Sequence, residues 1–207
     1  MEATDVILEE TNFYRYYTEK GGLSKEDFTK FSAYFSFKEV PHNTYLLRAD
    51  EVCSHSFFVE SGLLESFSLD EKGGEHILQF APENWIVSDR ASLYFDKPSE
   101  YYIKAIEHSL IVFIQPDFLM KASQANSDFS CFLENSLQRN IYVQQKRISS
   151  LLAMTARERY LSFMETYPGL MLRVPQWMIA SYLGITPESL SRVRRELLND
   201  DRNARKK

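Results

Sequence analysis

The sequence predicts an α+β protein with a β-rich N-terminal part, a long central helix and a helical C-terminal part. Three observations support this division. Short apolar runs, separated by turn residues, occupy the stretch from about residue 39 to residue 113, as in a barrel or sandwich. After Pro116 the apolar residues recur at helical spacing instead. Finally, residues 1–138 carry 11 Lys and Arg against 23 Asp and Glu, whereas residues 139–207 carry 13 against 6, which suits the C-terminal part to a polyanion.

Length and composition restrict the class of protein. With 207 residues, of which 44% are hydrophobic and 26% charged, the chain can fold around a core of its own. No apolar stretch approaches the roughly 20 residues of a membrane-spanning helix, and residues 1–10 are acidic where a signal peptide would be basic and then apolar. Cys53 and Cys131 lie far apart without a CxxC motif, so we expect two buried or inert thiols. We expect a cytoplasmic protein that does not bind membranes.

Six short runs are expected to form strands because they are bounded by turn residues. They are Thr44–Leu47, Ser56–Glu60, Leu63–Leu69, His76–Phe80, Tyr101–Ala105 and Ser109–Ile114. The polar segment Asp70–Glu75 contains Gly73 and Gly74, which can adopt positive φ, and therefore predicts a hairpin. Ser61 and Gly62 predict a second turn.

The first forty residues are predicted to be helical. Apolar side chains fall near helical spacing at Leu23, Phe28, Phe31, Tyr34 and Phe35. Ser24, three residues before Asp27, is suited to cap one of these helices. The aromatic cluster Phe13–Tyr17 allows two interpretations, a base-stacking platform or helix packing, and its acidic surroundings favour packing.

A long helix is predicted from a cap at Asn126 or Ser127 to about Met154. Apolar residues and one glutamine repeat along it at intervals of 4, 3, 4 and 3, the spacing of a coiled-coil seam. They are Leu137, Ile141, Gln144, Ile148 and Leu151. This spacing favours a partner helix, with Gln144 fixing the register, although the same stripe could pack on the protein's own β-rich part.

A new helix is predicted after the long one, because Thr155 and Glu158 match a capping box; it runs to about Tyr167. Two further helices follow between Val174 and Leu198, joined by a turn at Gly184. Apolar residues and one small residue occur where two crossing helices would need them. They are Ile179, Ala180, Leu183, Ile185, Leu190 and Val193. The pattern is that of a helix-turn-helix.

The second of these helices has an outward face suited to a major groove. Its polar residues share one side when Leu190, Val193 and Leu197 face inward. The outward set is Pro187, Glu188, Ser191, Arg192 and Arg195. Arginine can pair with guanine, glutamate can accept from cytosine, and serine can meet a base or a phosphate. An ordinary helix hairpin with exposed charges is the alternative interpretation.

Here the chain resembles the cyclic-AMP receptor protein/Fnr superfamily of bacterial transcription regulators. Residues 174–193 look like its winged helix-turn-helix, and the Glu188-x-x-Ser191-Arg192 signature is similar to that of the Fnr-like recognition helix. The segments Phe58–Leu63, Asp70–His76 and Leu78–Phe80 resemble its jelly-roll effector domain. The resemblance implies an effector domain over residues 1–125, a dimerisation helix over 126–154 and a winged helix-turn-helix over 155–207.

The resemblance also implies partners and site residues. The expected partners are double-stranded DNA with a near-palindromic operator, a second copy of the chain, and RNA polymerase if the protein is an activator. The residues expected to contact DNA are Gln176, Thr186, Pro187, Glu188, Ser189, Ser191, Arg192 and Arg195. Any wing would be short, because the chain ends soon after the recognition helix and only Leu170–Val174 is a candidate.

The expected effector pocket departs from that of the nucleotide-binding relatives. The resemblance places Ser88 where a ribose-binding glutamate belongs, and Ser99 with Glu100 where a phosphate-binding arginine pair belongs. Arg90 or Lys104 could supply a positive charge there if the loop were rearranged. We therefore expect no cofactor and no binding of cyclic AMP.

Catalysis has little support in the sequence. The four histidines are scattered singly, and no metal-site or nucleophile motif occurs. The alternative function is a non-enzymatic sensor of a small molecule, or a scaffold, whose helix-turn-helix mediates protein contacts. The basic C-terminal third favours DNA.

Overall fold

The structure, a computed structural model, describes residues 6–204. Residues 1–5 and 205–207, which the expected outer domains include, lie outside the described residues. The chain forms two compact units, one of residues 1–74 and 78–138, the other of residues 75–77 and 139–207. The second unit is therefore discontinuous in sequence, because it includes residues 75–77.

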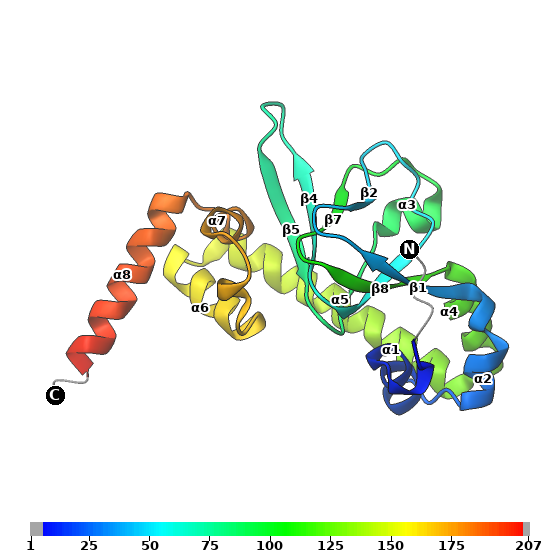
Figure 1. The fold of residues 1–207 in the computed structure, drawn as a ribbon. Coiled ribbons are helices and arrows are strands. Elements are labelled where there is room, and N and C mark those ends of the chain that lie inside the picture. Colours follow the sequence, from blue (N-terminus) through cyan, green and yellow to red (C-terminus); the bar gives the residue numbers. More distant parts are fainter. Residues whose placement is uncertain (1–5, 205–207) are drawn as a thin grey trace. The chain divides into compact units, whose positions relative to one another are not determined.

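The first unit contains two four-stranded sheets (Figure 1). One has the order β1-β8-β3-β6, from Phe35–Val40, Ser109–Ile114, Ser56–Ser61 and Ile86–Val87. The other has the order β2-β7-β4-β5, from Tyr45–Leu47, Tyr102–Ala105, Leu64–Leu69 and Glu75–Ala81. Alternating side chains point into the space between the sheets, where Val59, Leu64 and Ile103 are buried in one cluster. The predicted jelly-roll fold is confirmed.

All six predicted strands occur, with ends shifted by at most one residue, but three elements differ from expectation. Phe35–Val40 is strand β1 and not the end of a helix, because it pairs antiparallel with β8 in the register Phe35↔Ile114. Strand β6 and the short helix α3, Arg90–Phe95, were not predicted. The predicted turn at Gly62 and the hairpin at Asp70–Glu75 are present, with Gly62 at φ +95° and Gly73 at φ +80°.

The N-terminal segment is helical up to Tyr34, as predicted, but in short pieces. They are η1 (Leu8–Glu10), α1 (Asn12–Arg15), η2 (Tyr16–Lys20), α2 (Lys25–Lys30) and η3 (Ser32–Tyr34). Ser24 caps α2 through a capping box with Asp27. Phe13 and Tyr17 are buried among aromatic rings from α4 (Pro116–Ala125) and the start of α5. Their rings meet edge to face and are inaccessible to bases, so this cluster is a core.

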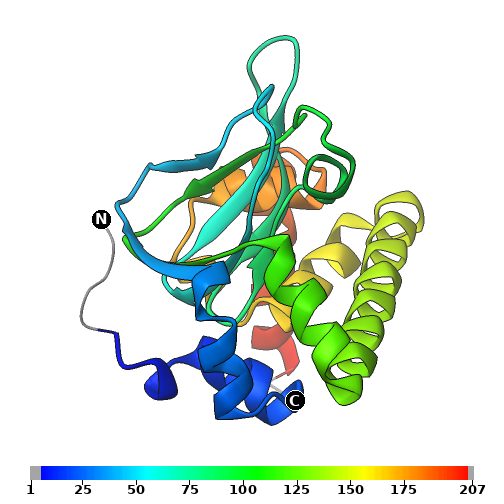
Figure 2. The ribbon, with the colours of Figure 1, turned by 90° about the vertical axis from the view of Figure 1, so that its right-hand side faces the viewer.

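Helix α5, Ser127–Ala153, is one continuous helix of 27 residues (Figure 2). Asn126 caps it by accepting a hydrogen bond from the Phe129 amide at 3.0 Å, which agrees with the prediction. Helix α6, Ala156–Thr166, begins at the predicted Thr155–Glu158 capping box. Helices α7, Gln176–Leu183, and α8, Pro187–Ala204, complete the second unit.

The expected wing is absent from the part of the second unit that the structure describes. Leu170–Leu172, inside the only candidate segment, forms a 3₁₀ turn that begins after Gly169 in the left-handed conformation. The segment is too short to fold back on itself as a hairpin, and α8 continues as helix to Ala204. This region is a helix-turn-helix without a described wing.

Candidate nucleic-acid interface

Helices α7 and α8 pack through the small and apolar side chains that the sequence marks. Ala180, Leu183, Leu190 and Val193 are all buried. Gly184 ends α7 at φ +64°, a conformation that favours glycine, and the Ile185 amide donates to the Ala180 carbonyl at 3.0 Å. The helix-turn-helix geometry therefore follows from a tight Schellman-like turn between two helices that share a core.

The start of α8 is fixed by polar contacts. The Ser189 amide donates to the Thr186 hydroxyl oxygen at 3.2 Å, so Thr186 is the N-cap, and Pro187 fills the first position of the helix. Hydrogen bonds from the Glu188 amide and from Thr186 hold the pKa of the Glu188 carboxyl below its usual value. Glu188 is therefore ionised at neutral pH and can only accept hydrogen bonds.

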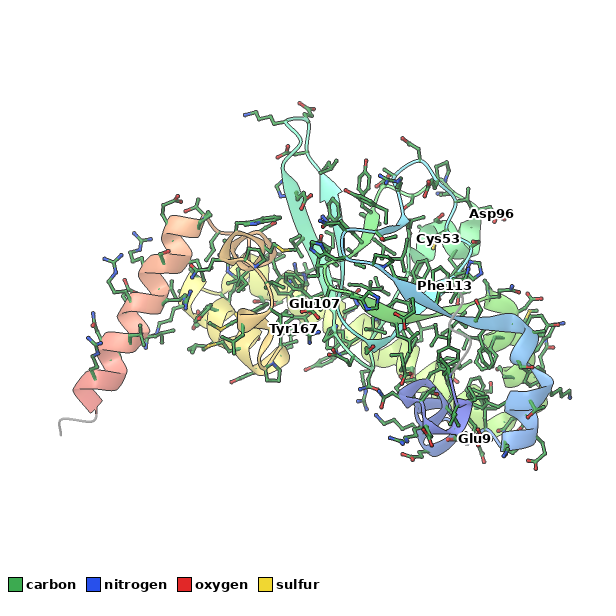
Figure 3. All side chains as sticks on the ribbon, in the orientation of Figure 1. Glu9, Cys53, Asp96, Glu107, Phe113 and Tyr167 are labelled. Carbon is green, nitrogen blue, oxygen red and sulfur yellow. The ribbon has the colours of Figure 1, made fainter. Side chains whose placement is uncertain are left out.

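Most of the residues predicted to contact DNA are exposed to solvent. Gln176, Thr186, Pro187, Glu188, Ser191, Arg192 and Arg195 are exposed. Ser189 is only half-buried, and its hydroxyl accepts from Thr186 at 3.2 Å, so it serves the cap of the helix. Side chains with nitrogen at their tips project along α8 (Figure 3). The exposed start of α8 therefore presents one negatively charged side chain, Glu188, and one positively charged side chain, Arg192, and each type can distinguish bases.

Two contacts that sequence reasoning missed hold α8 against α6. Arg157 Nη1 lies 2.7 Å from Asp200 Oδ2, joining the first turn of α6 to the later part of α8. Arg194 hydrogen-bonds to Tyr160, which opposes the rise in the pKa of the Tyr160 hydroxyl caused by burial. No spacing rule links these residues, because α6 and α8 are separated in sequence by helix α7 and the turns on either side of it.

The predicted seam of α5 is exposed in the described chain. The exposed fractions are 38% for Leu137, 44% for Ile141, 58% for Ile148 and 40% for Leu151, and Gln144 is also exposed. Leu152, which we did not include, is 83% exposed and lies four residues after Ile148, on the same face. Such a row of exposed large apolar residues is costly in water without a partner.

Three residues of the expected effector pocket adjoin one buried carboxylate, Asp89: Ser88 and Arg90 flank it in sequence and Ser99 is hydrogen-bonded to it. Asp89 caps α3, and its Oδ1 accepts from the Ala91 and Ser92 amides at 2.9 and 3.2 Å. Ser99 is buried and donates to Asp89 Oδ2 at 2.7 Å. Ser88 is half-buried, and Glu100 and Arg90 are exposed. The Arg90 guanidinium lies 5.0 Å from the centre of the Tyr94 ring.

The two cysteines are free, and they differ in environment. Cys53 is buried, burial raises the pKa of its thiol, and its Sγ donates to the His55 carbonyl at 3.2 Å. Cys131 is exposed on α5, so only Cys53 of the two thiols is buried. Among residues 6–204 no group of His, Cys, Asp or Glu has the arrangement of a metal site. None of the helices described is both long and apolar enough to span a membrane.

Comparison with known proteins supports the fold. Residues 37–126 match the cyclic nucleotide-binding domain family. FixK2 from Bradyrhizobium japonicum is similar with a TM-score of 0.68 at 18% identity, covering 81% of this chain and 86% of that one. A mutant of CooA from Carboxydothermus hydrogenoformans is similar with a TM-score of 0.69 at 18% identity, covering 92% and 85%. No curated protein matches the sequence significantly.

A third solved structure extends the comparison. The c-di-GMP-responsive global regulator CLP from Xanthomonas campestris has a TM-score of 0.66 at 16% identity, covering 86% of this chain and 93% of that one. At these identities the similarity establishes a shared fold, and the residues of the site have to be argued from their own chemistry.

Proposed function

Because residues 37–126 match the cyclic nucleotide-binding domain within a chain that has the fold of Crp/Fnr regulators, we propose that the protein is a cytoplasmic, DNA-binding transcription regulator. The observation that carries this proposal is the exposed start of α8. Glu188, Ser191 and Arg192 lie there on one face of a capped helix, within a helix-turn-helix. Such a helix fits the major groove, where these side chains can meet base edges.

The charge of the second unit supports DNA over a protein partner. Residues 139–207 carry 13 basic against 6 acidic residues, and the basic excess attracts phosphates along a duplex. Gln176, at the start of α7, and Thr186 are exposed and suited to phosphate contacts beside the groove. A helix-turn-helix that served protein contacts would not require this excess.

We further propose that the protein acts as a homodimer through the seam of α5. The seam residues are Leu137, Ile141, Gln144, Ile148 and Leu151, to which we add Leu152. A second copy of the same helix would cover this stripe with a matching one, as in a two-stranded coiled coil. A twofold dimer would place two recognition helices on a near-palindromic operator. RNA polymerase would be a further partner if the protein activates transcription.

The effector domain is proposed not to bind cyclic AMP. At the start of α3 the Asp89 carboxylate accepts two backbone amide hydrogen bonds, which are the donors that a phosphate group would otherwise use. Asp89 and the exposed Glu100 would both repel a phosphodiester. The sequence contains no nucleophile or metal motif at a spacing typical of a catalytic site, so we propose binding without catalysis.

Selection of bound duplexes from a random DNA pool tests the main proposal. The expected result is one enriched sequence with inverted half-sites centred about 10 base pairs apart or at a multiple of that distance. Binding to every sequence with equal affinity at moderate salt would contradict sequence recognition. No binding at all would favour the alternative, a sensor or scaffold whose helix-turn-helix contacts protein.

A further inference from the structure

Strand β5 is the edge strand of its sheet, and it begins within the second unit. In the order β2-β7-β4-β5 it is the last strand, so every second residue directs its amide and carbonyl away from β4. Its first three residues, Glu75–Ile77, belong to the second unit. Unpaired backbone groups at such an edge need partners from elsewhere.

Ser181 on α7 supplies two of these partners with one hydroxyl. The Ile77 amide donates to Ser181 Oγ at 3.0 Å, and the same hydroxyl donates to the Glu75 carbonyl at 2.8 Å. Glu75 and Ile77 are two residues apart, so both groups point to the same side of the strand. The hydroxyl therefore occupies the place that a neighbouring strand would take.

Arg147 on α5 supplies the next partner along the edge. Its Nη2 donates to the Ile77 carbonyl at 3.3 Å and to the Tyr182 carbonyl at 3.1 Å. The guanidinium also lies 3.7 Å from the centre of the Tyr182 ring. One arginine thus joins β5 to the last turn of α7, and a lysine could not reproduce the paired donors and the flat contact with the ring.

We propose that Ser181 and Arg147 form an edge clasp, a set of positioning residues that holds α7 against residues 75–77 within the second unit and thereby positions the recognition helix. This inference rests on the proposed DNA binding and adds residues that do not face the DNA. Both side chains are only half-buried. Because α7 and α8 share the core of Ala180 and Leu190, a tilt of α7 would carry the contact face of α8 with it.

The test compares Ser181→Ala with Ser181→Thr, which keeps the hydroxyl. DNA affinity is measured by fluorescence anisotropy on the selected duplex, and helix content by far-UV circular dichroism. We expect Ser181→Ala to lose roughly tenfold in affinity, because two hydrogen bonds are removed, while helix content stays that of the wild type. Ser181→Thr should recover most of the affinity. Ser162→Ala, at a half-buried serine on α6, is the matched control and should bind as the wild type does.

Amide hydrogen exchange gives a readout that simple loss of stability would not produce. The Ile77 amide should exchange faster in Ser181→Ala, whereas the Leu93 amide of α3, hydrogen-bonded to the Asp89 carbonyl, should be unchanged. Faster exchange at both amides would show a general loosening and overturn the clasp. If Ser181→Ala fails to fold, Arg147→Lys, with an expected loss in affinity of the same order, carries the test.

The outcomes separate the clasp from the proposed function. Wild-type protein that binds no DNA sequence contradicts DNA binding itself. Wild-type protein that binds, while Ser181→Ala and Arg147→Lys bind equally well, overturns the clasp and leaves the regulator intact. Tighter binding by either variant also overturns it, because the contacts would then restrain the recognition helix.

Discussion

Ser99 donates a 2.7 Å hydrogen bond to Asp89, and both side chains are buried in the first unit. The Asp89 carboxylate also accepts hydrogen bonds from two backbone amides at the start of α3. These amides are therefore already paired with a negatively charged group of the protein itself. The pair joins α3 to the segment before β7, the region in which the superfamily resemblance places the effector pocket.

We predict that neither cyclic AMP nor cyclic GMP binds. A phosphodiester would have to displace Asp89 from its amide partners and lie near its charge, which is unfavourable without a bidentate arginine. Isothermal titration calorimetry with each nucleotide should give no binding heat at micromolar concentrations. Micromolar binding of either nucleotide would contradict the proposal that this domain does not bind cyclic nucleotides.

Replacing Arg192 with alanine should weaken specific DNA binding by roughly 1–3 kcal/mol and relax one base position. The exposed guanidinium lies in the second turn of α8, where it can reach a base edge. Arg202→Ala is the control, because this exposed arginine lies ten residues later, about 15 Å along the helix. Anisotropy on cognate and scrambled duplexes is the measurement, and equal losses on both would assign Arg192 to phosphate only.

The Ile148→Asp variant should be monomeric. A charge in the middle of the proposed seam would be desolvated in the dimer at a cost of several kcal/mol. Tyr142→Asp places the same charge at a 63% exposed position on the opposite side of α5 and should leave the dimer intact. Sedimentation equilibrium distinguishes the two states, and a monomeric wild-type protein would rule out the seam.

Substitution of Gly62 by alanine should destabilise the first unit by about 3 kcal/mol or more. Gly62 has φ +95°, and a Cβ there would lie 2.2 Å from Ser109 Oγ and 2.8 Å from Ser109 Cα. Gly73→Ala is the matched control, with φ +80° but open space around the added carbon, and should cost about 1 kcal/mol. Urea unfolding of both variants tests the difference, and equal losses would mean that the close approach does not matter.

The two thiols should react at different rates with a thiol reagent such as dithionitrobenzoate. Cys131 is exposed, whereas Cys53 is 3% exposed and burial raises the pKa of its thiol, so less thiolate is present at neutral pH. We expect one fast thiol per native chain and two after unfolding. Cys131→Ser should remove the fast phase, and its persistence would assign that phase to Cys53.

The sequence predicted those parts of the fold whose signals are local. The caps at Ser24, Asn126 and Thr155 each depend on residues within three positions, and all three occur. Gly184 and the apolar pattern around it likewise predicted the helix-turn-helix. Strand β1 was mistaken for helix because Phe35 follows helical spacing, and only its distant partner β8 makes it a strand.

The candidate site likewise contains residues that the sequence predicted and contacts that it could not predict. The exposed face of α8 follows from helical periodicity, so Glu188, Ser191 and Arg192 could be identified as candidates without a structure. The Arg157–Asp200 ion pair spans 43 residues of sequence, and the contact from Ser181 to Glu75 spans 106. Such pairings depend on tertiary packing, which no window along the sequence contains.

The discontinuity of the second unit limits how the protein can be dissected. A fragment starting at residue 139 would contain every helix after the middle of α5 but would lack Glu75–Ile77. The Ser181 hydroxyl and the Arg147 guanidinium would then lose their β-strand acceptors, and solvent would have to replace them. The part proposed to bind DNA could therefore not be transferred to another protein as one continuous segment, and a graft onto another scaffold would need a strand edge of matching geometry.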